Sequence, residues 1–129
     1  MLNNKLNGIL ILIITLFVSY FSFSEKSENQ EPQQLIIGEW QHENDEKSLW
    51  VFSNENVLKR IYDSEIRSIG TWHIVDMCEG EYIHEEDFGM LETTFESGIT
   101  QCYVIQGLNG TLTLLSVPQG RLLIFDKVE

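Results

Sequence analysis

Basic residues are scarce in this sequence, and their scarcity restricts the partners of the protein. Its 129 residues include 8 Lys or Arg against 20 Asp or Glu, for a formal net charge of −12 at pH 7. An acidic surface repels phosphate backbones and anionic lipid heads, so we expect no nucleic-acid partner and no membrane contact beyond the N-terminal segment. Such a surface tolerates a basic partner, or it simply maintains solubility outside the cytoplasm.

Motifs for catalysis and for metal binding are also missing. His42, His73 and His84 fall in separate segments, and neither a nucleophile-elbow glycine pattern nor a Cys-x-x-Cys spacing occurs. The stretch 79–96 holds seven acids and no Lys or Arg, but its spacing fits no EF-hand, and one histidine is too little for zinc. We therefore predict no enzyme activity, no cofactor and no metal site, and we interpret this stretch as a solvated acidic loop.

The N-terminal 24 residues have the organisation of an export signal. Lys5 precedes an uncharged apolar run over residues 8–23, and serines stand before a candidate cleavage site at Glu25. The run is shorter than the roughly 20 residues that a transmembrane helix needs. We predict a signal peptide over 1–24 and a periplasmic or secreted protein; the alternative is an uncleaved N-terminal membrane anchor.

The mature chain is predicted to hold one domain. Residues 25–34 are polar and contain a proline, so we expect a flexible leader ahead of a domain at 35–129. Cys78 and Cys102 are the only cysteines. In an exported chain they favour a disulfide, which would stabilise the fold by about 3 kcal/mol; the alternative is two buried free thiols.

Beyond the leader, short β-like runs alternate with turn residues, and no segment keeps a helical apolar period for three turns. Asn109-Gly110 is a strong two-residue hairpin signal. The predicted strands are 35–42, 48–52, 57–62, 66–75, 100–108, 111–117 and 121–128, with the stretch 83–96 as the candidate for an eighth. We predict an all-β, antiparallel up-and-down meander that closes into a small barrel or a curled sheet.

The predicted strand 66–75 has the clearest alternation. Its even positions, which include Ile66, Gly70 and Trp72, form an apolar face. A glycine inside such a strand lets a neighbouring backbone or aromatic ring approach closely, or lets the strand bend.

Two Gly-x-Trp steps carry a resemblance to a known family. The Gly-Glu-Trp step at 38–40 follows two isoleucines and resembles the first strand of the lipocalins. The Gly-Thr-Trp step at 70–72 resembles a mid-chain strand of the small lipocalin-like domains of exported bacterial proteins. The similarity runs from about residue 35 to residue 128, which is nearly the whole mature chain.

The resemblance implies an antiparallel barrel with Trp40 closing one end over the core, Trp72 in the core, and a cavity for a small apolar ligand. The domain is shorter than a full lipocalin, so its own side chains could fill that cavity. The family's C-terminal arginine signature is not evident, and Arg121 is the candidate for an arginine packed on a tryptophan.

Two functions remain open from the sequence. One is an exported carrier of a small hydrophobic ligand, and the other is an interaction domain with a filled core and an acidic surface that docks another exported protein. Aromatic residues on half-buried strands are more often core than ligand contacts. Tyr62, His73 and Tyr103 combine such positions with polar tips, so we expect them to be the ligand-binding residues if a cavity exists.

Overall fold

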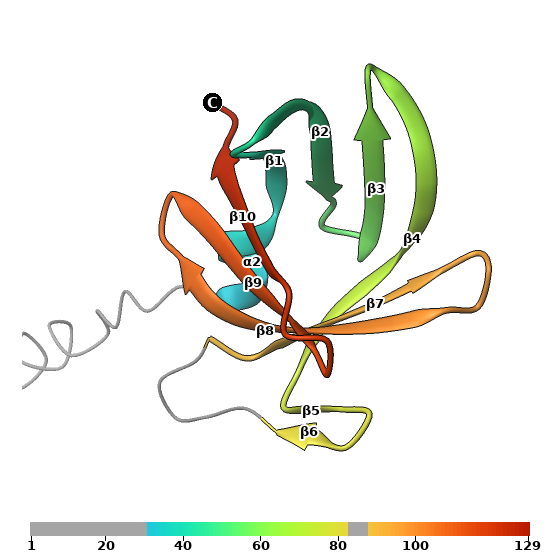
Figure 1. The fold of residues 1–129 in the computed structure, drawn as a ribbon, viewed down its shortest axis with the longest axis vertical. Helices are drawn as coiled ribbons and strands as arrows, with labels where there is room; N and C mark the ends of the chain where they lie inside the picture. Colours follow the sequence, from blue (N-terminus) through green and yellow to red (C-terminus); the bar gives the residue numbers. More distant parts are fainter. Residues whose placement is uncertain (1–30, 83–87) are drawn as a thin grey trace, which may run out of the picture.

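The structure, a computed structural model, describes residues 31–82 and 88–129. The predicted signal peptide, most of the predicted leader and part of the acidic stretch lie outside these residues. Eight strands close into one antiparallel barrel in the order β1-β10-β9-β8-β7-β4-β3-β2 (Figure 1). The barrel strands are β1 (Gly38–His42), β2 (Asp45–Phe52), β3 (Val57–Tyr62), β4 (Glu65–Val75), β7 (Met90–Phe95), β8 (Thr100–Leu108), β9 (Thr111–Val117) and β10 (Leu122–Lys127).

The predicted all-β meander is therefore confirmed, and β7 is the eighth strand. Most strands pair with their neighbours in sequence, because short turns such as Asn109-Gly110 connect them. The barrel closes where β1 pairs with β10, with Trp40 opposite Lys127. A two-stranded sheet of β5 (Met77–Cys78) and β6 (Glu81–Tyr82) lies in the connection between β4 and β7.

The start of the domain differs from the prediction. Residues 32–36, predicted as leader and first strand, form the short helix α2 (Pro32–Ile36). Proline is tolerated in a first helical turn because the amide that it lacks has no partner there. The polar residues 43–47 were predicted to separate two strands, but β2 already begins at Asp45. The connection is thus a tight turn, closed by a hydrogen bond from Asn44 N to His42 Nδ1 at 3.2 Å.

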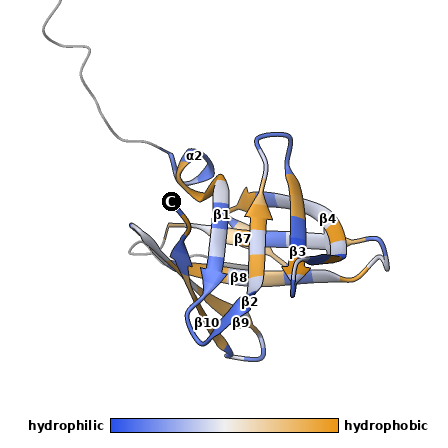
Figure 2. Ribbon diagram, turned by 90° about the horizontal axis from the view of Figure 1, so that it is seen from above, coloured by the Kyte–Doolittle hydropathy of each residue, from blue (hydrophilic) through white to orange (hydrophobic). Residues whose placement is uncertain are grey.

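Helix α2 closes one end of the barrel. It contacts β4 and β8 and buries Ile36, whose carbonyl accepts a hydrogen bond from Trp40 Nε1 at 2.7 Å. Figure 2 shows α2 at the edge of the barrel beside β1. Among residues 31–82 and 88–129, no helix has the length and apolar character needed to span a bilayer.

The interior next to this end is filled with large side chains. Trp40 is 1% exposed and Trp72 is fully buried. The Phe52 ring meets Trp72 edge to face at 5.6 Å, and Trp72 Nε1 donates a hydrogen bond to the Ser53 carbonyl at 3.2 Å. Edge-to-face packing and a satisfied indole N–H are the arrangement expected of aromatic residues in a core. Leu58 and Leu112 are also fully buried in this cluster.

Gly70 is required by a close approach of β7. A β-carbon at this position would overlap the Thr94 carbonyl oxygen and lie 2.8 Å from Phe95 Cδ1. Both a backbone and an aromatic ring therefore come close, as the glycine predicted. The apolar face predicted for the same strand is wrong at Ile66, which is 54% exposed. A register shift opposite Arg60 and Ile61 of β3 interrupts the alternation there.

We expect Gly70→Ala to destabilise the fold by about 1 to 3 kcal/mol, because the added methyl group has no free space. The free energy of unfolding in urea, followed by circular dichroism, measures this loss. Thr71→Ala, at the next and exposed position of β4, is the matched control and should change stability little. Equal stability of the two variants would contradict the close packing of β4 on β7.

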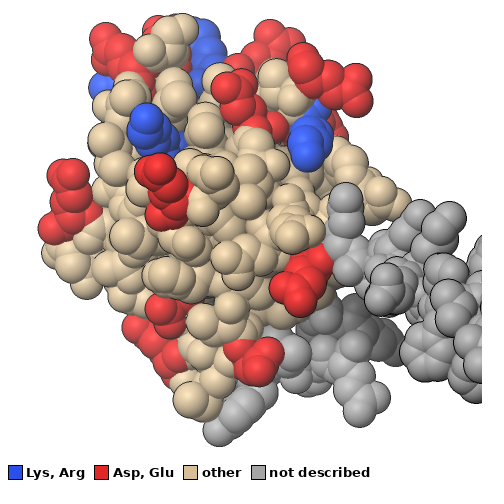
Figure 3. All heavy atoms as spheres, turned by 180° about the vertical axis from the view of Figure 1, so that it is seen from behind, with Lys and Arg blue, Asp and Glu red and all other residues tan. Residues whose placement is uncertain are grey.

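Charged side chains are dispersed over the surface. Figure 3 shows acidic groups around the margin of one face, whose centre is mostly uncharged. The one ion pair among the described residues, between Arg67 and Glu65 at 3.3 Å, is exposed on both sides. Such exposed pairs contribute little to stability, so the fold depends on its core and its sheet closure.

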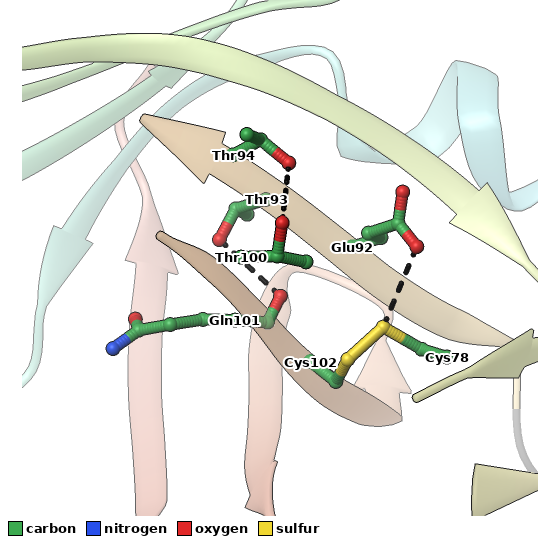
Figure 4. Close-up of a disulfide and its surroundings, with 7 residues drawn as sticks. All are labelled: Cys78, Glu92, Thr93, Thr94, Thr100, Gln101 and Cys102. Carbon is green, nitrogen blue, oxygen red and sulfur yellow. Dashed lines mark hydrogen bonds between the residues drawn. A yellow bond between two sulfur atoms is a disulfide. The ribbon is translucent and has the colours of Figure 1, made fainter. Parts of the chain in front are cut away.

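A second apolar cluster lies outside the main core and contains the disulfide. Cys78 of β5 is bonded to Cys102 of β8 (Figure 4). Both cysteines pack with Met90 and Val104. The disulfide predicted from the two cysteines is thus present. Figure 4 also marks a 3.6 Å contact from Cys78 Sγ to the Glu92 carboxylate. A disulfide sulfur has no proton to donate, so this is a packing contact rather than a hydrogen bond.

We expect a double Cys78→Ser, Cys102→Ser variant to lose about 3 kcal/mol of unfolding free energy, because the unfolded chain regains the freedom of a long loop. Urea unfolding of the variant and of the parent, with and without reductant, measures the difference. The reduced parent should approach the variant. Identical midpoints for the oxidised parent and the variant would show that the bridge does not stabilise the fold.

Candidate ligand-binding pocket

A pocket of about 550 Å³ lies at the end of the barrel where β9 turns into β10. Its size falls in the range of about 300 to 1,000 Å³ that is typical of small-molecule sites. The wall is built from several strands and the β9–β10 turn. The lining residues are Trp50, Arg60, Glu79, Thr100, Gln101, Cys102, Tyr103, Ser116, Val117, Pro118, Gln119, Arg121 and Leu123.

The pocket lies opposite the end that α2 closes. Residues 121, 123, 125 and 127 share one face of the β10 segment, since side chains alternate along a strand. Leu123 lines the pocket and Phe125 is buried in the main core. The last of them, Lys127, has its Nζ 5.4 Å from the centre of the Trp40 ring. This face thus runs from the pocket through the core to the closed end.

The cation over Trp40 is therefore Lys127, and the expectation that Arg121 takes this place is wrong. Arg121 lines the pocket at the other end of β10. Gly38 has a positive φ of 136°, a backbone conformation that residues with side chains rarely adopt, and a β-carbon there would be in ordinary contact with Lys127 Cε at 3.5 Å. The glycine of the first Gly-x-Trp step is therefore required by its backbone conformation and not by the lysine beside the tryptophan ring.

Trp50 separates the pocket from the filled core. It is 7% exposed, and its ring lies 4.9 Å from that of Phe125 and 5.9 Å from that of Tyr103. One side of the indole therefore packs in the core while the residue also lines the pocket. Together with Leu123, it gives the pocket an apolar floor.

Arg60 extends from β3 into the interior between aromatic rings. Its guanidinium carbon is 3.8 Å from the centre of the Phe95 ring and 6.0 Å from that of Trp50. The Nε–H donates to Ser68 Oγ at 2.7 Å. Burial of the guanidinium lowers the pKa of Arg60, with an opposing contribution from Tyr103. The charge is held in place by aromatic faces and one hydroxyl group.

Tyr103 comes from β8 on the other side of the pocket. It is 4% exposed, and its hydroxyl donates a hydrogen bond to Gln101 Oε1 at 2.6 Å. Burial raises the pKa of Tyr103, because the phenolate loses hydration, while the charge of Arg60 acts in the opposite direction. Tyr103 is thus a neutral phenol near a guanidinium at neutral pH.

Two further charged residues lie at the pocket, Glu79 and Arg121, and both are exposed. In the described part of the chain, no group of three or more His, Cys, Asp or Glu side chains could hold a metal ion. The lining residues offer a ligand hydrogen bonding, charge and aromatic packing.

The three predicted ligand contacts are not brought together. Tyr103 lines the pocket, but Tyr62 and His73 do not. Tyr62 shares a face of β3 with Arg60 but lies at the strand end and is 41% exposed. His73 is exposed on β4, paired opposite Glu92 of β7.

Sequence reasoning missed Arg60 as a pocket residue. A signal for Arg60 existed, because it shares the strand face of Leu58 and so belongs to the inward side. The other face of β3 carries Val57 and Ile61, which made the two sides of the strand hard to distinguish.

A scan of the chain against protein-family models finds no match, and searches of curated proteins and of solved structures find no significant match.

We expect the Tyr103 phenol to ionise above the usual pKa of about 10, so a late step should appear in an ultraviolet titration of the folded protein. A raised pKa stabilises the fold below the unfolded-state pKa, and this stability is lost as pH rises through the folded-state pKa. Tyr103→Phe should remove the late step from the titration and should also remove this part of the loss of stability at alkaline pH. Tyr62→Phe, at an exposed position, should retain the late step; its loss in that variant instead would contradict the assignment.

Proposed function

We propose that this protein is an exported, lipocalin-like barrel that binds one small molecule in the pocket at the open end of the barrel. The observation that carries the proposal is a 550 Å³ pocket in an antiparallel barrel whose opposite end is filled and closed. Binding proteins built on small barrels use such a mouth, because the sheet supplies a rigid wall.

The lipocalin-like assignment is supported by the first Gly-x-Trp step and its surroundings. Trp40 is buried at the closed end, donates to the carbonyl of Ile36 and carries Lys127 over its ring. Glycine at position 38 supplies the positive φ with which the chain enters β1. This is the role that the resemblance implies for the tryptophan, with lysine in place of arginine.

Export is supported by two independent features. The first 24 residues have the pattern of a signal peptide. The disulfide between Cys78 and Cys102 is of a kind that persists in oxidising compartments and is rare in the cytosol. The signal pattern and the disulfide therefore favour the same location, the periplasm or the outside of the cell.

The pocket favours a ligand with an apolar body. Trp50 and Leu123 give it an apolar floor, whereas Thr100, Ser116 and Gln119 make much of the rest polar. A ligand that buries an aromatic or aliphatic part against the indole and keeps polar groups outward fits this division. The alternative, an interaction domain with a filled core, leaves the pocket without a role.

A neutral fluorescent probe, N-phenylnaphthylamine, tests the pocket without relying on charge. We expect saturable binding of one probe per chain, which Leu123→Trp weakens by about tenfold or more because the larger side chain fills the pocket. Leu122→Trp is the matched control, since Leu122 is the neighbouring residue on the opposite face of β10 and is 51% exposed. Fluorescence titration gives both affinities.

Absence of saturable binding by the parent, or equal effects of the two tryptophan variants, would overturn the proposal. Native mass spectrometry of protein exported by its own signal adds a second readout. A native mass above the denatured mass by the size of a small molecule would identify retained cargo, and a bound polypeptide would favour the interaction domain instead.

A further inference from the structure

The pocket has a charge opposite to that of the chain. The chain has a formal net charge of −12 and three arginines, and two of these, Arg60 and Arg121, line the pocket. Among the lining residues that the structure describes, Glu79 is the one acid, and it is exposed. Charges farther away than a Debye length of about 8 Å are largely screened at physiological salt, so Arg60, Arg121 and Glu79 are the described charges that act most strongly on a ligand in the pocket.

Arg60 is the more buried of the two, and only some of its hydrogen-bond donors have partners in the protein. Its Nε–H is used by Ser68, and the described residues offer its two Nη groups neither a hydrogen-bond acceptor nor an ion-pair partner. No buried side-chain polar atom of the described chain lacks a partner, so these Nη groups are open to solvent through the pocket. Two parallel N–H groups thus remain available at the end of a held guanidinium.

The fixed position of Arg60 suits a planar anion. Phe95 and Trp50 hold the guanidinium at 3.8 and 6.0 Å, and Ser68 fixes its inner edge. The outer edge of a guanidinium matches the two oxygens of a carboxylate, which can accept both N–H groups at once. Since the side chain is already ordered, binding such a group loses little further side-chain entropy.

Tyr103 offers a further polar group in the same pocket. Its hydroxyl donates to Gln101, which is exposed and can turn to solvent, so the phenol proton is available to a ligand oxygen. Burial disfavours both the charge of Arg60 and the ionised form of Tyr103. An anion placed in the pocket would restore part of the stabilisation that the arginine loses when it leaves water.

We propose that the pocket recognises a small organic carboxylate, whose carboxyl group pairs with the free Nη groups of Arg60 and whose apolar body packs on Trp50 and Leu123. The inference rests on the proposed ligand-binding function and adds the chemical class of the ligand. Arg121, at the exposed rim, attracts the anion but does not fix it.

Competition against bound N-phenylnaphthylamine tests this class with two probes of nearly the same shape, naphthoate and naphthamide. We expect naphthoate to displace the dye from the parent at a concentration about tenfold or more below that of naphthamide, because only the carboxylate forms a charged pair. Arg60→Met keeps the length and apolar stem of the side chain but removes its charge. It should abolish this preference, which is read as the ratio of the two competitor concentrations and therefore does not depend on the affinity of the variant for the dye.

Arg67→Met is the matched control, since Arg67 is the exposed partner of Glu65 outside the pocket lining. It should retain the full preference for naphthoate. Arg60→Lys, which keeps the charge but not the paired N–H groups, should retain only part of it.

Equal competition by naphthoate and naphthamide in the parent, or an undiminished preference in Arg60→Met, would overturn the carboxylate proposal while dye binding still supports the pocket. Loss of dye binding by the parent itself would instead remove the proposed function. A variant that fails to fold would lose dye binding and its circular dichroism together, and Arg60→Lys then supplies the comparison.

Discussion

Pairing of β1 with β10 closes the sheet, and the rest of the structure depends on this closure. β1 has only five residues, yet it bonds to β10 on one side and to β2 on the other, with Trp40 opposite both Lys127 and Trp50. A closed barrel has no exposed strand edges, which in an open sheet would pair with other chains. Closure also fixes the interior volume, so side chains or a ligand must occupy it.

The interior is filled unevenly because large side chains gather at one end. Ile36 of α2, Trp40, Phe52 and Trp72 pack at the closed end, where each is at most 1% exposed. Toward the pocket, inner positions instead carry small or polar residues such as Ser68 and Ser116. The unfilled volume therefore results from small and polar residues at inward positions of the strands. Arg60 lies at the boundary between the two regions, with its stem inside and its Nη groups in the pocket.

Sequence reasoning predicted the strand order well and the pocket poorly, for different physical reasons. Strands such as Thr111–Val117 and turns such as Asn109-Gly110 follow from local alternation and local backbone preferences. The close approach of β7 at Gly70 could also be predicted, since a glycine within a strand usually marks a bend or a close neighbour. These features depend on neighbours in the chain.

The pocket depends on which strands meet across the barrel, and no local pattern encodes that. Arg60 on β3 approaches Phe95 on β7, and Trp50 on β2 approaches Tyr103 on β8. Tyr62 and His73 were predicted from polar tips on half-buried strands, but both are exposed and lie outside the lining of this pocket. The helical turn at Pro32–Ile36 was missed because its apolar residues also suit a strand, and docking on the barrel end determined the outcome.

The disulfide couples the outer wall of the barrel to the pocket. Consecutive residues of β8 point to opposite sides, so Cys102 faces the second apolar cluster while Tyr103 faces the interior. Glu79, the residue after Cys78, lies at the pocket rim, and Cys102 also belongs to the lining. The bridge therefore fixes the β4–β7 connection against the strand that carries Tyr103. Formation of the disulfide thus stabilises both the fold and the wall of the pocket that β8 provides.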